Sequence, residues 1–313
     1  MHVGFTFILS VPKDKHTCFG SIRVMKHLVQ RALDVYREQG AISAASKSAR
    51  YATRAVVHRL GKKWLYGDPH YRSLSTWMNA GMGSYTAVAD PLEVYRIDPE
   101  AITYITGRGP NPGRFQWQQL GTICGGNWDR PNEKFTDLEL HRGLYDRFHN
   151  GLTWEETDFA HRVCDQAANG TADWKNVRSE RDLRRAFERV DALYESIDEN
   201  GYRTMTELVD AGVVDPRTHR LPEPLVRRDE VTVDIGRDGQ FLFVDGRHRL
   251  AIAKIMDLEM IPVRISARHT QWQRIRELAA ATAPDKQLPE PVARHRDHPD
   301  LADIFASDRT ERA

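Results

Sequence analysis

One short segment constrains the fold more than any other, because in it an apolar strand turns directly into a helix. The strand is Phe241 to Val244, the turn is Asp245-Gly246, and the helix covers Leu250 to Met256. A second strand-like run, Val231 to Ile235, precedes it across Gly236-Arg237-Asp238-Gly239, a sequence typical of hairpin turns. The segment therefore predicts a β-hairpin followed at once by a helix, in a fold that mixes strands and helices.

The turn into this helix carries chemistry as well as shape. Gly246 lets the backbone turn and approach a ligand closely, and the amides that follow it open a helix N-terminus, which favours an anion. Arg247, His248 and Arg249 add two permanent positive charges and one titratable charge, and Arg is a bidentate donor to phosphate. Asp245 precedes the corner, where its carboxylate could hold Mg²⁺ that bridges phosphates. The alternative is a surface turn whose charges pair with nearby acids.

The sequence Asp245-Gly246-Arg247-His248-Arg249, between a hairpin strand and a helix, resembles the signature of the ParB/sulfiredoxin-like superfamily. This superfamily includes the ParB N-terminal domain, sulfiredoxin and the free-serine kinases, and its Gly-x-x-Arg motif binds nucleotide phosphates. Ser196-Ile197 to Gly201 is similar to the end of the family's preceding helix, and the match covers about residues 190–266. The resemblance implies that Gly246 to Arg249 bind ATP, ADP or CTP, and that Arg249→Ala loses most of this binding.

The chain departs from the family pattern in two places. Sulfiredoxin's catalytic Cys falls where this chain has Arg247, so sulfinic-acid reductase chemistry is not supported. The family's first strand normally lies close upstream, but the best candidate here, Val94 to Ile102, lies about ninety residues earlier, which implies a large insertion that is helical at about 130–190. Asp98-Pro99-Glu100 loosely resembles the turn where the serine kinases keep a catalytic carboxylate, whereas a capping acid is the alternative role for Glu100.

Periodic apolar positions and turn signals predict the remaining elements. The end of the chain, from Ala283, is rich in Pro, His and Asp and predicts a tail that is flexible or draped over the surface, with Leu301 to Phe305 as a docking turn. The predicted helices lie within Leu138 to Phe148, Trp154 to Ala168, Leu183 to Ile197 and Trp272 to Ala281, and further short strands are Leu92 to Tyr95, Leu120 to Cys124 and Ile261 to Ile265.

A second motif, Gly125-Gly126-Asn127-Trp128-Asp129, follows an apolar run. Its glycines allow a tight fold, and its last three residues offer an amide, a stacking surface and a carboxylate. In the superfamily interpretation this loop, with Arg108 and Arg114, covers the nucleotide or holds a second substrate. The alternative is a tight turn anchored by a buried Trp128.

The charge of the chain is unevenly distributed. Residues 1–63 contain twelve Lys or Arg and three Asp or Glu, which gives +9, and the remaining 33 basic and 41 acidic residues give −8. Residues 23–63 have the periodicity of two helices, with Lys47, Arg50 and Arg54 on one side of the second. This arm is predicted to lie on DNA phosphates or anionic lipid, or to pack on the body with its basic face in water.

Cysteine usage and hydropathy bound the location of the chain. Cys18, Cys124 and Cys164 form neither a disulfide framework nor a CxxC pair. The chain has no apolar run of about 18 residues and no signal peptide pattern. A cytoplasmic protein is therefore expected.

The sequence as a whole predicts four regions, a nucleotide-binding role and an open choice of reaction. The regions are a basic helical extension (1–66), a linker (67–89), a ParB/sulfiredoxin-like α+β domain (90–266), and a C-terminal helix with a flexible tail (267–313). If the chain is an enzyme, Mg²⁺-dependent phosphoryl transfer to a small molecule is preferred, with Asp129 or Glu100 as the carboxylate base. The alternative is a DNA-associated module, either a ParB-like nuclease or a nucleotide-switched DNA binder that uses the N-terminal helices.

Overall fold

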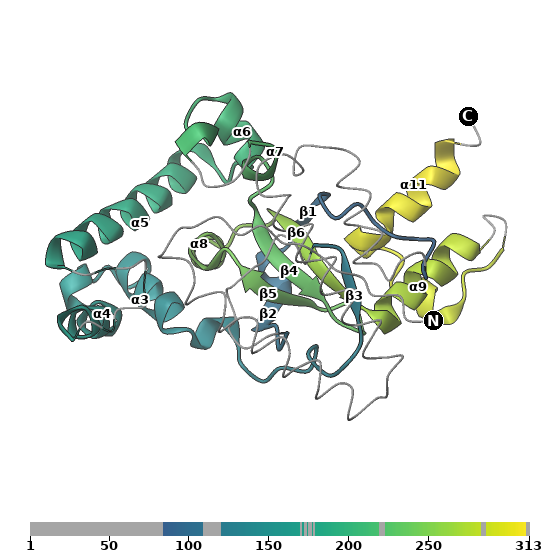
Figure 1. Cartoon of the computed structure of the whole chain (residues 1–313), viewed down its shortest axis with the longest axis horizontal. Helices are drawn as coiled ribbons and strands as arrows, with labels where there is room; N and C mark the ends of the chain where they lie inside the picture. Colours follow the sequence, from purple (N-terminus) through teal and green to yellow (C-terminus); the bar gives the residue numbers. More distant parts are fainter. Residues whose placement is uncertain are drawn as a thin grey trace, which may run out of the picture. The chain divides into compact units, whose positions relative to one another are not determined.

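The computed structural model describes residues 84–108, 120–169, 171, 174, 177, 179–218, 223–282 and 286–310. Within these residues the chain is a mixed α+β fold around one six-stranded sheet (Figure 1), so the predicted fold class is confirmed at this level. The predicted basic N-terminal helices and Arg114 lie outside the described residues. The DNA and membrane hypotheses for that arm therefore stay predictions.

The sheet has the strand order β1-β6-β4-β5-β2, and β3 also pairs with β6. β4 lies between β5, its antiparallel hairpin partner, and β6, which runs parallel to it. β2 is parallel to β5, whereas β1 is antiparallel to β6. The strands are β1 (Val94–Ile97), β2 (Ile102–Ile105), β3 (Thr122–Cys124), β4 (Val231–Ile235), β5 (Phe241–Asp245) and β6 (Ile261–His269).

The predicted hairpin is confirmed by the pairing of β4 with β5 and by the Gly236 N–H, which donates to the Gln240 carbonyl at 3.0 Å. The strand predicted to end at Ile265 continues to His269. The apolar pattern stops at Ile265 because Ser266 and Arg268 are polar, yet both are at most 3% exposed. A strand can continue through polar residues when tertiary partners satisfy them, and a sequence pattern does not show such partners.

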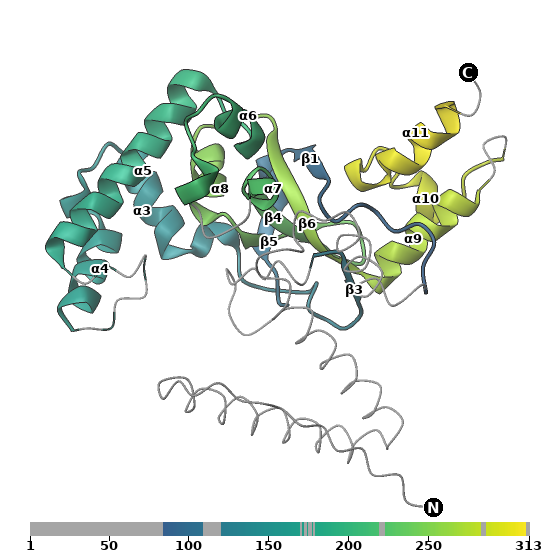
Figure 2. The same cartoon turned by 45° about the horizontal axis from the view of Figure 1, so that its top comes forward.

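The helices flank the sheet on two sides. In both views α3, α4 and α5 lie together on the left, α8 lies between them and the strands, and α9 and α11 lie on the right, where Figure 2 also shows α10 (Figures 1 and 2). Among the described helices none combines the length and the apolar character that a membrane crossing needs. The helices are α3 (Glu139–Phe148), α4 (Asp158–Ala168), α5 (Glu180–Asn200), α6 (Met205–Asp210), α7 (Glu223–Val226), α8 (Arg247–Ile255), α9 (Thr270–Ala281), α10 (Glu290–Ala293) and α11 (Ala302–Thr310).

The segment between β3 and β4 packs on the same hydrophobic core as the sheet. The predicted helices at 138–148, 154–168 and 183–197 are confirmed as α3, α4 and α5. Stacked aromatic rings join them, with Phe148 on Tyr194 at 4.0 Å and Trp154 on Phe187 at 4.2 Å between ring centroids. This segment therefore belongs to the core and is not an appended surface loop.

The C-terminal tail differs from the flexible segment that its composition predicts. Val292 and Leu301 are fully buried, so the predicted docking turn at Leu301 is confirmed. The ring of His298 stacks on Phe241 with centroids 4.9 Å apart. The prediction of flexibility fails in this part of the tail because Asp300, polar in sequence, is a buried acceptor for side chains of β6 and α9.

Candidate functional site

The corner between β5 and α8 has the backbone that the sequence predicts. β5 ends at Asp245, Gly246 adopts a left-handed conformation with φ of 93°, and α8 begins at Arg247. A Cβ atom at Gly246 would lie 3.0 Å from the Val231 Cα, so a side chain has no room there. The first helical hydrogen bond runs from the Leu250 N–H to the Gly246 carbonyl at 3.0 Å, so the preceding amides open the helix N-terminus.

Asp245 and Arg247 are the charged residues on either side of Gly246 in this corner. Asp245 is half-buried, and its Oδ1 accepts the Gly246 N–H at 2.8 Å. Burial is the main cause that raises the pKa of its carboxyl above the usual value. Arg247 is exposed and takes part in none of the ion pairs formed within the described residues. Arg247 is therefore the charge of the motif that a ligand can reach directly.

Arg249 differs from Arg247, because its guanidinium is paired with groups of the protein itself. Its Nη1 lies 3.2 Å from the Glu230 Oε2, and its Nη2 donates to the Asp229 carbonyl at 2.5 Å. The Arg249 side chain is 20% exposed and the Glu230 side chain is fully buried. In the structure the Arg249 guanidinium holds the start of β4, and a direct contact of Arg249 with phosphate stays a prediction.

His248 differs from both arginines, since its ring lies against an aromatic side chain. The centroid of the half-buried His248 ring is 6.0 Å from that of Trp174, which in turn contacts Phe159 and Phe187. Trp174 thus lies beside the first turn of α8.

Asp129 lies at the opposite end of β5 from Gly246. Its carboxylate accepts the Arg237 backbone N–H at 2.9 Å and the Arg237 guanidinium at 2.6 Å. Arg237 is in the turn before β5, and the chain from Gln240, where that turn ends, to Gly246 spans roughly 20 Å at about 3.4 Å per residue. The prediction that Asp129 is a catalytic base at the phosphate corner is therefore wrong in its geometry. The carboxylate fastens the hairpin turn to the GGNWD loop.

The other residues assigned to a substrate loop also have structural partners. The Arg108 Nε donates to the Asp234 carboxylate at 2.9 Å, and its Nη2 to the Ser266 hydroxyl at 2.6 Å. The Asn127 side-chain oxygen accepts from Arg237 at 3.1 Å, and Trp128 is half-buried beside the ring of His269. These contacts fit the tight-turn alternative, in which the loop is an anchor for the sheet.

Glu100 lies near the far end of α8. Its Oε1 is 3.2 Å from the Nζ of Lys254, in the last turn of that helix. Lys254 is seven residues from Arg247, which is roughly 10 Å along a helix axis. Asp98, and not Glu100, caps the short 3-10 helix by accepting the Glu100 N–H at 2.7 Å. Glu100 is the acidic residue in the first turn of this 3-10 helix, and its role as a catalytic base stays a prediction.

Two residues of the corner were missed in the sequence. From the sequence Glu230 is expected to be a surface acid before a strand. In the structure it is 2% exposed, and its carboxylate accepts hydrogen bonds from Arg249 and the Met205 N–H. Tyr202 follows the helix-ending Gly201 and packs against the core next to Arg249. A polar residue directly before an apolar strand gives no sequence signal of burial, so only the three-dimensional structure reveals the role of Glu230.

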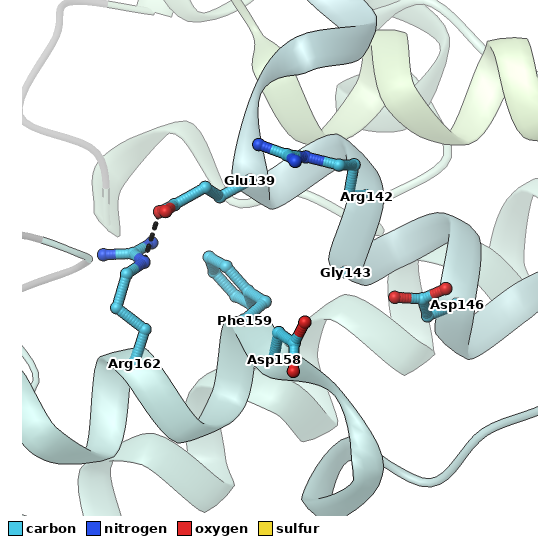
Figure 3. Close-up of a pocket in the computed structure, with 7 residues that line it drawn as sticks. All are labelled: Glu139, Arg142, Gly143, Asp146, Asp158, Phe159 and Arg162. Carbon is cyan, nitrogen blue, oxygen red and sulfur yellow. Dashed lines mark ion pairs between the residues drawn. The ribbon is translucent and has the colours of Figure 1, made fainter.

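A cavity of about 320 Å³ lies elsewhere, between α3 and α4 (Figure 3). Glu139 pairs with Arg162 across it, and Arg162 also lies over the ring of Phe159. None of the site residues predicted from the sequence lines it. Its lining is Glu139, Arg142, Gly143, Asp146, Asp158, Phe159 and Arg162.

No protein family model, no curated protein and no solved structure matches this chain. The described residues also contain no group of three or more His, Cys, Asp or Glu side chains that could hold a metal ion.

We expect Asp129→Asn to lower the free energy of unfolding at pH 7 by about 2 kcal/mol, because Asp129 is charged and bound to Arg237. Although burial raises it, the hydrogen bonds from Arg237 lower the pKa of Asp129 to about 2, from 3.8. This stabilisation is present above pH 3.8 and disappears as the pH falls through 2. Urea unfolding between pH 7 and 3 should show that the difference in the free energy of unfolding between wild type and Asp129→Asn becomes smaller at the acid end. Asp238→Asn, exposed in the same turn, is the control, and an equal loss in both variants would contradict the assignment.

Proposed function

We propose that this chain is a ParB/sulfiredoxin-like protein that binds the phosphates of a nucleotide, ATP, ADP or CTP, at the N-terminus of α8. The order α5, β4, β5, α8, β6 follows the order of elements that the superfamily resemblance implies. The phosphate lies on the amides after Gly246, with Arg247 as the direct cationic partner and His248 beside it. Arg249 contributes to the site indirectly, because it fixes the position of the start of β4.

The observation that carries this proposal is the left-handed Gly246, at which a side-chain Cβ would lie only 3.0 Å from the Val231 Cα. Gly246 turns the chain so that the first turn of α8 faces outward at a half-buried corner. The helix itself is anchored in the core, where Leu250 to Ala253 are fully buried. A helix N-terminus attracts anions through its amides and its partial positive charge. An exposed arginine in that first turn adds a bidentate donor that suits phosphate.

The arrangement favours binding over catalysis. Phosphoryl transfer needs a group that positions the nucleophile next to the phosphate, and Asp129 and Glu100 are both held elsewhere. Asp245 is the remaining carboxylate at the corner, with one oxygen occupied by the Gly246 N–H. In a Mg²⁺–nucleotide complex Asp245 would be a protein ligand, with phosphates and water as the others, as is usual for this ion. A phosphotransferase thus stays the second part of the proposal, dependent on Asp245.

We expect Arg247→Glu to weaken binding of ATP, ADP or CTP at least tenfold, since a hydrogen bond to a charged group is worth about 1.5–3 kcal/mol. Isothermal titration calorimetry in Mg²⁺ buffer measures this affinity. The fold should be unaffected, because Arg247 is exposed.

Arg274→Glu is the matched control for this variant. Arg274 is an exposed arginine on α9, on the other side of the sheet from α8. Arg274→Glu changes the charge by the same amount as Arg247→Glu. Equal nucleotide affinity in wild type, Arg247→Glu and Arg274→Glu would reject the proposed site. Loss in both variants would show a general charge effect and not a site at α8.

A further inference from the structure

The C-terminal tail is attached to the sheet by a histidine whose two ring nitrogens are both engaged. The His298 Nε2 lies 2.9 Å from the Gly239 carbonyl oxygen in the turn between β4 and β5, and its Nδ1 accepts the Asp300 N–H at 3.1 Å. The second contact caps the short 3-10 helix that precedes α11. The ring also stacks on Phe241 of β5, and its centroid lies 4.4 Å from that of Trp272 on α9. One imidazole therefore connects the tail to the hairpin turn, to β5 and to α9.

These two partners determine the protonation state of the His298 ring. A carbonyl oxygen only accepts hydrogen bonds, so the Nε2 that faces Gly239 carries a proton. A backbone N–H only donates, so the Nδ1 that faces Asp300 carries none. The ring is therefore neutral, with its proton on Nε2. A second proton would sit on Nδ1 and point at the Asp300 N–H, so protonation removes the contact that caps the 3-10 helix.

The titratable and charged side chains around His298 and its partner Asp300 belong to the tail, β6, α9 and the hairpin turn. They are Asp300, His295 and Asp303 of the tail, Arg268 of β6, Arg276 of α9 and Asp238 of the turn. The Asp300 charge favours a protonated ring, but this carboxylate is already paired with Arg268. Burial has the larger effect and lowers the pKa of His298 below its usual value. The docked ring therefore takes up a second proton less readily than a histidine in water does.

We infer that His298 makes the attachment of the C-terminal tail sensitive to pH: the neutral ring holds the tail on the sheet, and protonation of Nδ1 loosens it. The released tail binds one proton that the docked tail excludes, so acid favours release below the pKa of a free histidine, about 6.5. The fraction of released tail should rise by up to about tenfold for each pH unit below 6.5, until the pH reaches the lower pKa of the docked ring. Release uncovers the rings of Phe241 and Trp272, which are at most 8% exposed when the tail is docked.

Hydrogen exchange of the tail amides in the full chain tests this inference, because exchange follows the fraction of released tail. His298→Asn keeps an acceptor for the Asp300 N–H but has no titratable ring. We expect the exchange rate of residues 295–305 in wild type, divided by the rate in His298→Asn at the same pH, to rise at least about fivefold between pH 7 and 5. His161→Asn is the matched control: His161 is an exposed histidine on α4, and this variant should keep the pH response of wild type.

An NMR titration of the His298 ring in wild type is a second test, which does not depend on how well the His298→Asn tail docks. The inference requires this ring to titrate below pH 6.5, and titration at or above 6.5 overturns it. An exchange ratio between wild type and His298→Asn that stays constant from pH 7 to 5 also overturns it, because the tail is then held independently of the imidazole proton. Loss of the pH response in His161→Asn as well would show acid unfolding of the whole protein and contradict a role of His298.

Discussion

Asp300→Ala is expected to lower the free energy of unfolding by about 3–5 kcal/mol, because it leaves the buried Arg268 guanidinium without its counter-charge. Asp300 is fully buried, and its carboxylate accepts from the Arg268 Nε at 2.9 Å and from the Trp272 indole N–H at 2.8 Å. Arg276, also buried, lies 3.4 Å from the same carboxylate. Burial alone raises the pKa of Asp300, but the Arg268 guanidinium holds it below its usual value.

Urea unfolding followed by circular dichroism measures this loss. Asp297→Ala is the control, since Asp297 is an exposed aspartate three residues earlier in the tail. Asp300→Asn keeps the shape and some hydrogen bonds but not the charge, so its loss should fall between those of the two alanine variants. A loss in Asp300→Ala no greater than in Asp297→Ala would show that the tail is not held by this carboxylate.

The tail illustrates what sequence reasoning could not predict about the fold. Composition marks residues 283–313 as polar, and polar composition usually means that too little apolar surface is buried to offset chain entropy. Here a satisfied polar cluster of Arg268, Trp272 and Asp300 adds to the apolar burial of the tail inside the protein. That cluster depends on residues about thirty positions apart in the chain, and no local periodicity reports it. The helices and the hairpin were predictable because their signals are local.

The candidate site likewise has one part that the local sequence predicts and one part that it does not. The left-handed turn at Gly246 and the helix after it follow from an Asp-Gly pair between an apolar strand and a periodic helix. The roles of the charges around it do not, because a charged residue acts as a ligand contact or as an internal brace according to its distant partner. Arg247 and Arg249 are two residues apart in one motif, yet one is exposed and the other is paired with Glu230. Asp129 is likewise committed to Arg237 from a hairpin 108 residues away.

Arg249→Ala is the second variant for which a large effect is expected, about 3–5 kcal/mol in the free energy of unfolding, because it strands the buried Glu230 carboxylate. Burial raises the pKa of Glu230, and the Arg249 charge opposes that shift. Removing Arg249 also frees the Asp229 carbonyl that it binds at 2.5 Å. The superfamily resemblance predicts a lost nucleotide contact in this variant, whereas the structure predicts a weakened fold.

A double-mutant cycle separates these two roles of Arg249. Glu230→Gln removes the stranded charge, so Arg249→Ala should cost clearly less stability in the Glu230→Gln background than in wild type. Stability comes from urea unfolding and affinity from calorimetry at a temperature where every variant is folded. If Arg249 acts by stabilising the fold, its effect on stability should depend on Glu230 in this way. Arg249→Ala should then lower nucleotide affinity far less than Arg247→Glu does. If Arg249→Ala unfolds like wild type and loses nucleotide affinity alone, Arg249 is a direct phosphate ligand, and its pairing with Glu230 must give way when nucleotide binds.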